Sequence, residues 1–218
     1  MFIVTGSSSG VGQELARILY SHDAKIYIAA RSEEKATQAI TDIKANCPGS
    51  KGEVVFLHLD LTDLATVKKS AEDFLSKETR LDVLWNNAAI MAPPHDCRTK
   101  QGYELHIGTN NIGPFLFTKL LTPILIKTAK SSPANTVRVV WVSSSAAELS
   151  PSGGVEIDNL DYKKGRYSYI RYSSSKAGNW YHSTEYDKRY RSDGVVSVVS
   201  WERTNVNDPV INRLCAGS

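Results

Sequence analysis

Short apolar runs alternate with longer segments of helical periodicity from one end of the chain to the other. The runs are rich in β-branched residues, which favours strands buried on both faces. Such alternation is typical of parallel strands joined by crossover helices. The pattern predicts six strands, at residues 2–4, 25–29, 53–58, 83–86, 137–142 and 195–200.

Between these runs, apolar positions recur with the spacing of an amphipathic helix. A Cys47-Pro48-Gly49 stretch and a Ser131-Ser132-Pro133 stretch end two of the helical segments. A chain of 218 residues fits one compact core, so we expect a single α/β domain over residues 1–218. The periodicity predicts five helices, at residues 11–20, 33–46, 64–76, about 103–130, and 172–191.

One long segment, residues 147–171, has no convincing period. It contains Gly153-Gly154, an acidic patch at Glu156 and Asp158, and a basic stretch at residues 163–166. Loops of this length in a compact domain are usually either functional or disordered.

The composition is that of a soluble globular protein, with 41% hydrophobic and 22% charged residues. No apolar run approaches the roughly 18 residues of a membrane span, and the net charge of +3 is spread along the chain, so we expect neither membrane nor nucleic-acid binding. Three scattered cysteines and no leader segment point to a reducing, cytoplasmic location. The five histidines have no metal-ligand spacing, so no metal is expected.

A glycine-rich segment, residues 5–12 with the sequence TGSSSGVG, follows the first strand and precedes the first helix. In this context the backbone amides and the helix N-terminus can face a dinucleotide pyrophosphate. The alternative is a turn that merely links strand to helix. The position between strand and helix favours phosphate binding.

The segment resembles the short-chain dehydrogenase/reductase family, whose Thr-Gly-x-x-x-Gly-x-Gly motif it matches at every defined position. The resemblance covers nearly the whole chain and implies a Rossmann-like, doubly wound parallel sheet. It also implies that cofactor-binding residues include Gly6, Ser8, Ser9, Gly10, Val11 and Gly12.

Cofactor choice depends on the end of the second strand, where NAD-binding folds place a carboxylate and an arginine accommodates the 2′-phosphate of NADP. Here the chain has Ala30-Arg31. A guanidinium can pair with phosphate, so NADP(H) is predicted, with NAD(H) as the alternative. Arg31 could instead pair with Glu33 or Glu34 as an ordinary surface charge.

Two polar segments follow the third and fourth strands, at the carboxyl edge where such sheets bind ligands. The resemblance implies that Asp60, followed by Leu61, contacts the adenine and that the segment from Asn86 through Ala88 lines the cofactor. Asp60 could equally cap the next helix. Ala89 stands where the family usually has glycine, which adds a methyl group beside the cofactor.

Tyr172 and Lys176 have the i, i+4 spacing that places two side chains on one helix face. A phenol has a pKa of about 10, so proton transfer near neutral pH needs a stabilising charge, which Lys176 can supply. Alone, this spacing more often marks an exposed helical pair. Here the two residues come after the glycine motif in the chain, in the order that the family has. The resemblance therefore predicts that Tyr172 and Lys176 are the catalytic pair and that both also contact the cofactor.

Two further catalytic candidates come from the resemblance. Ser144 follows the fifth strand, where its hydroxyl can hydrogen-bond a substrate carbonyl, and Ser143 or Ser145 would replace it if the turn is displaced. The family places an asparagine of a proton relay at a kink in the long helix, which selects Asn110, with Asn111 as the competitor. Pro114 makes a kink there plausible.

The resemblance implies hydride transfer between a nicotinamide and a small carbonyl or alcohol substrate, with Tyr172 as general acid/base. The segment between Ser144 and Tyr172 resembles the retinol-dehydrogenase and protochlorophyllide-reductase branch. After residue 200 the family pattern weakens: Thr204 is the candidate nicotinamide contact, but a Pro-Gly turn, a lid and a seventh strand have no matching sequence. A truncated or degenerate dinucleotide-binding protein with little turnover is the alternative, and homodimerisation is left open.

Overall fold

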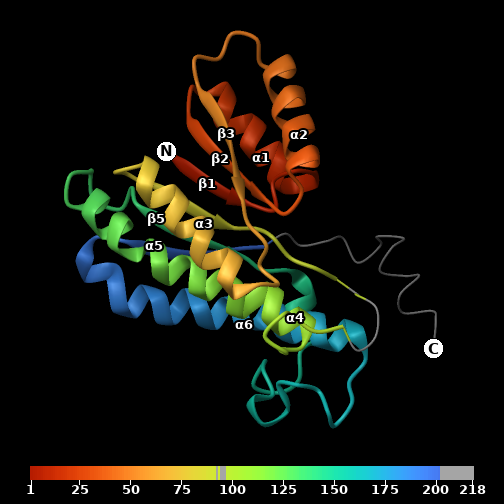
Figure 1. Ribbon diagram of the computed structural model, residues 1–218. Coiled ribbons are helices and arrows are strands. Elements are labelled where there is room, and N and C mark those ends of the chain that lie inside the picture. The colour runs from red at the N-terminus through yellow and green to blue at the C-terminus, as the bar shows by residue number, and fades with distance from the viewer. Residues whose placement is uncertain (92, 94–96, 202–218) are drawn as a thin grey trace.

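The computed structural model describes residues 1–91, 93 and 97–201. Six strands form one sheet in the order β3-β2-β1-β4-β5-β6, and every neighbouring pair is parallel (Figure 1). The order reverses between β1 and β4, the position at which parallel sheets of this type open a crevice for ligands. The strands are β1 (Phe2–Thr5), β2 (Lys25–Ala30), β3 (Glu53–His58), β4 (Val83–Asn86), β5 (Arg138–Val142) and β6 (Val196–Ser200).

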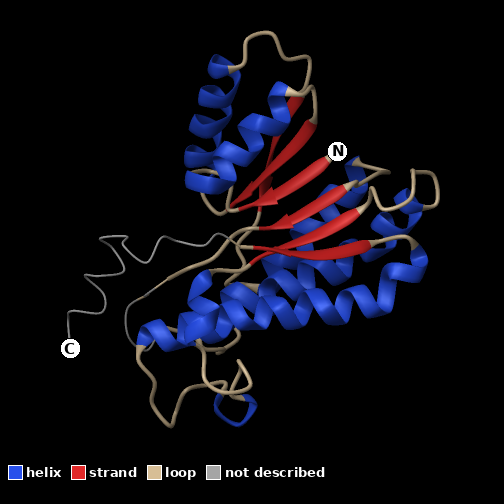
Figure 2. Ribbon diagram, turned by 180° about the vertical axis from the view of Figure 1, so that it is seen from behind, coloured by secondary structure: helices blue, strands red, loops and turns tan. Residues whose placement is uncertain are grey.

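Helices cover both faces of the sheet (Figure 2). Two helices, α1 and α2, pack on the β1–β3 half of one face, whereas α3, α5 and α6 lie on the opposite face. The predicted doubly wound α/β fold is therefore confirmed. The helices are α1 (Gly10–Ser21), α2 (Glu33–Asn46), α3 (Leu64–Lys77), α4 (Leu105–Ile107), α5 (Gly113–Ala129) and α6 (Ser168–Tyr190), with short 3₁₀ turns at Ser145–Leu149, Ile157–Asn159 and Arg191–Asp193.

The sheet divides the apolar interior into two cores, because successive side chains of a strand point to opposite faces. Along β2, Ile26 and Ile28 face α1 and α2, whereas Tyr27 packs on the α3 side against Phe74. The core on the side of α3, α5 and α6 is the larger of the two and includes Trp141.

The long helix predicted at residues 103–130 is interrupted. A π-helical turn (Gly108–Ile112) separates α4 from α5 and brings Asn110 to the irregular position. Pro114 lies in the first turn of α5, directly after the π turn, so the irregularity falls where the sequence predicted a kink. The turn also lets Gly113 approach Leu61 so closely that a Cβ atom would lie 2.6 Å from the Leu61 carbonyl oxygen.

The helix predicted from Tyr172 begins four residues earlier, at Ser168. Its N-cap residue Tyr167 makes no side-chain capping bond, so the usual start signal is missing from the sequence. Much of the aperiodic segment before it is a loop with two 3₁₀ turns.

The segment Leu105–Ala129 has the length and mean hydropathy of a membrane span, at 25 residues and 1.3. In the structure it is a core segment, with Phe117, Leu121 and Leu125 fully buried among α3, α6 and the sheet.

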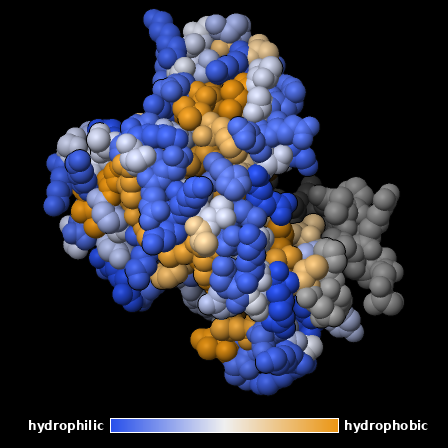
Figure 3. Space-filling model, viewed as in Figure 1, coloured by the Kyte–Doolittle hydropathy of each residue, from blue (hydrophilic) through white to orange (hydrophobic). Residues whose placement is uncertain are grey.

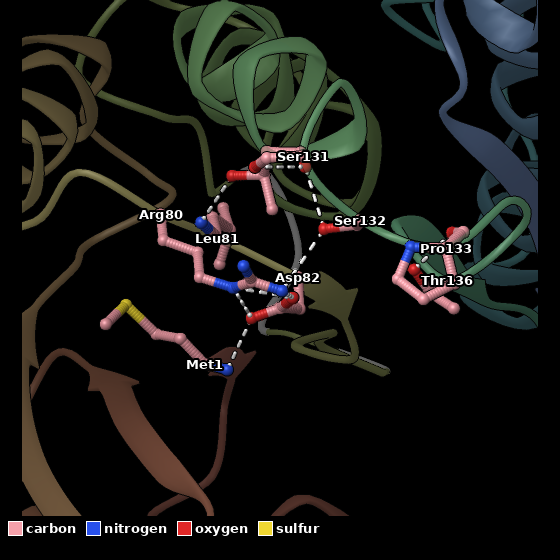
Figure 4. Close-up of polar contacts among 9 residues, drawn as sticks. Met1, Arg80, Leu81, Asp82, Ser131, Ser132, Pro133 and Thr136 are labelled. Atoms are coloured by element: carbon pink, nitrogen blue, oxygen red, sulfur yellow. Dashed lines mark hydrogen bonds and ion pairs between the residues drawn. The ribbon is translucent and has the colours of Figure 1, made fainter.

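An ion-pair cluster joins the amino ends of β1 and β4 (Figure 4). Asp82 accepts from the Met1 amino group at 2.6 Å and from Arg80 Nε at 2.9 Å. Arg80 also donates to Ser132 Oγ at 3.1 Å, which ties the end of α5 to the same point. These cations hold the pKa of the partly buried Asp82 carboxyl below its usual value, against the opposing effect of desolvation.

We expect Asp82→Asn to lower the free energy of unfolding by about 2 kcal/mol at pH 7, because it removes a charge that accepts several hydrogen bonds. A carboxyl with a lowered folded-state pKa stabilises the protein above its unfolded pKa and loses this effect as the pH falls. The loss measured by urea denaturation should therefore shrink toward pH 3. Asp73→Asn, in an exposed pair with Lys77, is the control and should change stability by less than about 0.5 kcal/mol.

Candidate active site

A cleft of about 540 Å³ runs along the carboxyl ends of the strands. It contains a helix N-terminus at one end and Tyr172 at the other. Twelve of the residues predicted from the sequence line it: Gly6, Ser8, Ser9, Val11, Gly12, Arg31, Asp60, Leu61, Ala88, Ser144, Tyr172 and Lys176.

The glycine-rich loop leaves the first amides of α1 without side-chain caps. Ser9 occupies the N-cap position in extended conformation, yet its hydroxyl caps nothing, and neither it nor Ser8 makes a side-chain hydrogen bond within the described residues. Gly12 has no room for a side chain, because a Cβ atom would lie 2.7 Å from the Gly6 carbonyl oxygen. The loop therefore offers uncapped donors around a close backbone approach, which suits an anion.

Thr5 holds this loop against the loop after β4. Its Oγ1 accepts from the backbone amides of Asn87 at 3.0 Å and Ala88 at 2.9 Å. The side-chain amide of Asn87 donates through Nδ2 to the Thr5 carbonyl at 2.8 Å. Gly6 is forced to remain glycine here by a positive φ of 66° and by Ala88, whose Cα would lie 2.8 Å from an added Cβ.

Asn86, predicted to bind the cofactor, lies outside the cleft. Its side chain has the same orientation as that of Leu84, two residues earlier in β4, and donates to Thr118 Oγ1 in the core at 2.9 Å. Asn87 lines the cleft instead, and strand alternation in the sequence was the signal that would have separated the two. Gly10, with a φ of 57°, also lies outside the cleft lining, and Thr204 lies outside the described residues.

Arg31 and Asp60 lie at the other strand ends of this half. Arg31 is exposed and makes no ion pair or hydrogen bond within the described part of the chain, so the pairing with Glu33 or Glu34 is not formed. Asp60 accepts from both the amide and the hydroxyl of Thr62, at 2.9 and 2.7 Å. The cap of α3 is Asp63, so Asp60 shapes the strand exit without capping the helix.

At the far end of the cleft, α6 brings Tyr172 and Lys176 beside the exit of β5. Lys176 is buried; its Nζ lies 5.7 Å from the Tyr172 ring centroid and donates to the Val142 carbonyl at 2.9 Å. The Ser144 hydroxyl is close enough to Tyr172 to favour the ionised phenol. Ser143 is committed elsewhere, because its hydroxyl donates to the Lys176 carbonyl and accepts from Trp180.

The net shift of the Tyr172 pKa is upward, whereas the spacing to Lys176 predicted a lowering. Burial raises the pKa of Tyr172 above its usual value, and Ser144 offsets only part of this effect. Burial also lowers the pKa of Lys176 to about 8, since its ammonium bonds a neutral carbonyl and no carboxylate. At neutral pH the tyrosine is therefore a protonated phenol beside a hydroxyl and a cationic lysine.

Asn110 lies behind the cleft and not in its lining. Its side chain both accepts from the Ile90 amide at 2.9 Å and donates to the Ile90 carbonyl at 3.0 Å. It donates further to Ser175 Oγ at 2.9 Å, and Ser175 Oγ bonds the Tyr172 carbonyl. Asn110 thus ties the loop after β4 to the helix that carries Tyr172. Asn111 donates instead to Ser175 and Asn179.

A sequence model of the family described as short chain dehydrogenase matches residues 1–207. The chain belongs to this family. A short-chain dehydrogenase/reductase from Phomopsis amygdali is 54% identical over 91% of this chain, which spans 60% of that protein's length.

Solved structures share the fold of this chain. A protein from Mycobacterium paratuberculosis superimposes with a TM-score of 0.73 and 31% identity, covering 92% of this chain and 66% of its own. A complex of RhlG with NADP from Pseudomonas aeruginosa gives a TM-score of 0.72 at 24% identity, with 99% and 79% of the chains covered.

We expect the buried ammonium of Lys176 to destabilise the folded state at neutral pH. A lowering from 10.5 to about 8 corresponds to a cost of about 3 kcal/mol while the folded state must hold the proton. We expect Lys176→Met to raise the free energy of unfolding at pH 7 by about 1–3 kcal/mol. The gain should disappear as the pH rises from 8 to 10.5, where the unfolded lysine also becomes neutral.

Urea denaturation at several pH values measures this difference. The exposed Lys188, which lies on the same helix, provides the control: Lys188→Met should change stability by less than about 0.5 kcal/mol. A Lys176→Met protein less stable than the parent at pH 7 would contradict the assignment.

Proposed function

We propose that this protein is an NADP(H)-dependent oxidoreductase that interconverts a carbonyl and an alcohol group on a small molecule, with Tyr172 as the general acid/base. The observation that carries the proposal is a single cleft with an uncapped helix N-terminus and the free Arg31 at one end, and Tyr172, Ser144 and Lys176 at the other. The Pseudomonas aeruginosa structure of the same fold holds NADP.

The residues present fit a dinucleotide. The α1 amides with Ser8 and Ser9 would bind the pyrophosphate, and the cradle between Gly6 and Gly12 admits close backbone approach. Asp60 and Leu61 line the adenosine side, and the unpaired Arg31 guanidinium suits a 2′-phosphate. When bound, NADPH supplies the hydride.

Three side chains at the catalytic end of the cleft would have separate roles in the reaction. Ser144 would hold the substrate oxygen by a hydrogen bond as negative charge develops on it, and Tyr172 would donate its phenolic proton to that oxygen. The Lys176 ammonium, 5.7 Å from the centre of the Tyr172 ring, would offset part of the negative charge left on Tyr172 once the proton has been given up. Because burial keeps Tyr172 protonated at neutral pH, its phenol is available as the proton donor for carbonyl reduction.

Tyr172→Phe tests the proton donor, since it removes one oxygen and keeps the ring. We expect kcat for NADPH-dependent reduction of a carbonyl panel to fall by about 10²–10⁴-fold, with NADPH affinity within about twofold. Absorbance at the NADPH band measures turnover, and fluorescence titration measures binding. Tyr167→Phe, a strongly exposed tyrosine of the same segment, is the control. If Tyr172→Phe kept its turnover, another residue would have to donate the proton. If the parent protein bound NADPH but turned over no carbonyl, a degenerate nucleotide-binding protein would be favoured.

Arg31→Ala tests the cofactor preference. Loss of a charge-assisted bond to phosphate should weaken NADPH binding by about 10–100-fold and leave NADH affinity nearly unchanged. Isothermal titration calorimetry with both nucleotides gives the two affinities. Arg17→Ala, in an exposed pair with Glu14 outside the cleft lining, should alter neither. Equal affinities for NADPH and NADH in the parent protein would refute the preference.

A further inference from the structure

A buried charged cluster lies next to the start of α6 and takes no part in the site described above. Glu104 is 6% exposed and His106 1% exposed. Glu104 accepts from His106 Nδ1 at 2.8 Å and from the Ile107 amide at 3.0 Å, and Arg171 Nη1 lies 3.8 Å from the same carboxylate. Burying a charge costs free energy unless the charge is paired, and the contacts of Glu104 with His106 and Arg171 supply this pairing.

Arg171, which immediately precedes Tyr172, connects three parts of the chain. Besides Glu104 at the start of α4, its Nε donates to the Arg166 carbonyl at 3.0 Å, and its guanidinium lies 5.2 Å from the centre of the Tyr162 ring. Tyr162 is 4% exposed and adopts a φ of 52°, a conformation unfavourable for a side chain of this size. The contacts with Arg171 help to offset that strain.

The residues before α6 form a loop, residues 156–167, that is cross-linked within itself. Asp158 pairs with Lys164 at 2.7 Å, Asp161 pairs with Lys163 at 2.8 Å, and Glu156 pairs with Arg166. Its side chains Ile157 and Tyr167 are 82% and 86% exposed, and the buried residues of the loop are Tyr162 and Asn159, at 4% and 2% exposed. Figure 3 shows apolar surface in this part of the molecule, at the bottom of the view.

The N-cap position of α6 has no side-chain cap. Tyr167 provides no capping bond, and the Ser168 hydroxyl is buried without a partner among the described residues. Uncapped helix ends fray, and Tyr172 lies only one turn beyond this end. A tertiary contact at Arg171 therefore replaces the missing cap at the point where fraying would displace Tyr172.

We propose that Arg171 is a positioning residue, which, paired with Glu104, holds loop 156–167 and the first turn of α6 so that Tyr172 stays aimed into the cleft. The effect on turnover rests on the proposed function, whereas the effect on the loop does not. Arg171 is not among the residues that line the cleft, so it would act on Tyr172 through the backbone of α6.

Two readouts on Arg171→Met test the proposal. Limited trypsin digestion, with fragments mapped by mass spectrometry, reports cleavage after Lys163, Lys164 and Arg166, which we expect to become about 10-fold faster as the loop detaches. In steady-state assays we expect kcat to fall about 10-fold, with NADPH affinity within about twofold. Arg171→Lys, which keeps the charge but cannot reproduce the guanidinium contacts, should recover part of both effects.

The matched control is Arg189→Met on the same helix, where an exposed pair with Glu185 is lost and neither readout should change. Because Arg171→Met leaves the buried Glu104 carboxylate without its arginine partner, the double variant Glu104→Gln/Arg171→Met repeats the test without an unpaired charge. Loop cleavage and kcat like those of Arg189→Met would overturn the proposal. If the parent turns over no carbonyl, the proposed function fails while the cleavage rates still decide the role of Arg171.

Discussion

The carbonyl oxygen of Val142, at the last residue of β5, accepts hydrogen bonds from Lys176 Nζ and Asn179 Nδ2, both at 2.9 Å. The two donors lie three residues apart on α6, so one acceptor fixes both the rotation of the helix and its height above the strand end. Ser143, the next residue, reinforces the contact through the Lys176 carbonyl. The place of Tyr172 in the cleft follows from this contact, because the tyrosine lies one turn before Lys176 on the same face.

Much of the fold and part of the site were predictable because they depend on local patterns. Strand β3, strand β4 and helix α2 have the predicted bounds, since each combines a clear period with nearby turn signals. The cleft likewise gathers the glycine loop, Arg31 and Tyr172, because parallel strands end at one edge.

Features that depend on tertiary contacts were not predictable in the same way. The start of α6 is held by Arg171 and Glu104, which are 67 residues apart in the sequence. No N-cap residue marks this start in the sequence. The π turn at Asn110 depends on contacts with Ile90 and Ser175. The pKa of Tyr172 is set by burial, which a spacing of four residues to a lysine does not reveal. The likeness to the retinol-dehydrogenase branch and homodimerisation stay predictions.

The division of the interior by the sheet has a consequence for how the molecule comes apart. Arg31 and the glycine loop belong to the half built on the smaller core with α1 and α2, whereas Lys176 and Tyr172 belong to the half with the larger core. A small core opens at lower free energy than a large one, so amide hydrogens of α1 and α2 should exchange before those of α5. A dinucleotide that spans the cleft would contact both halves and make them open as one cooperative unit.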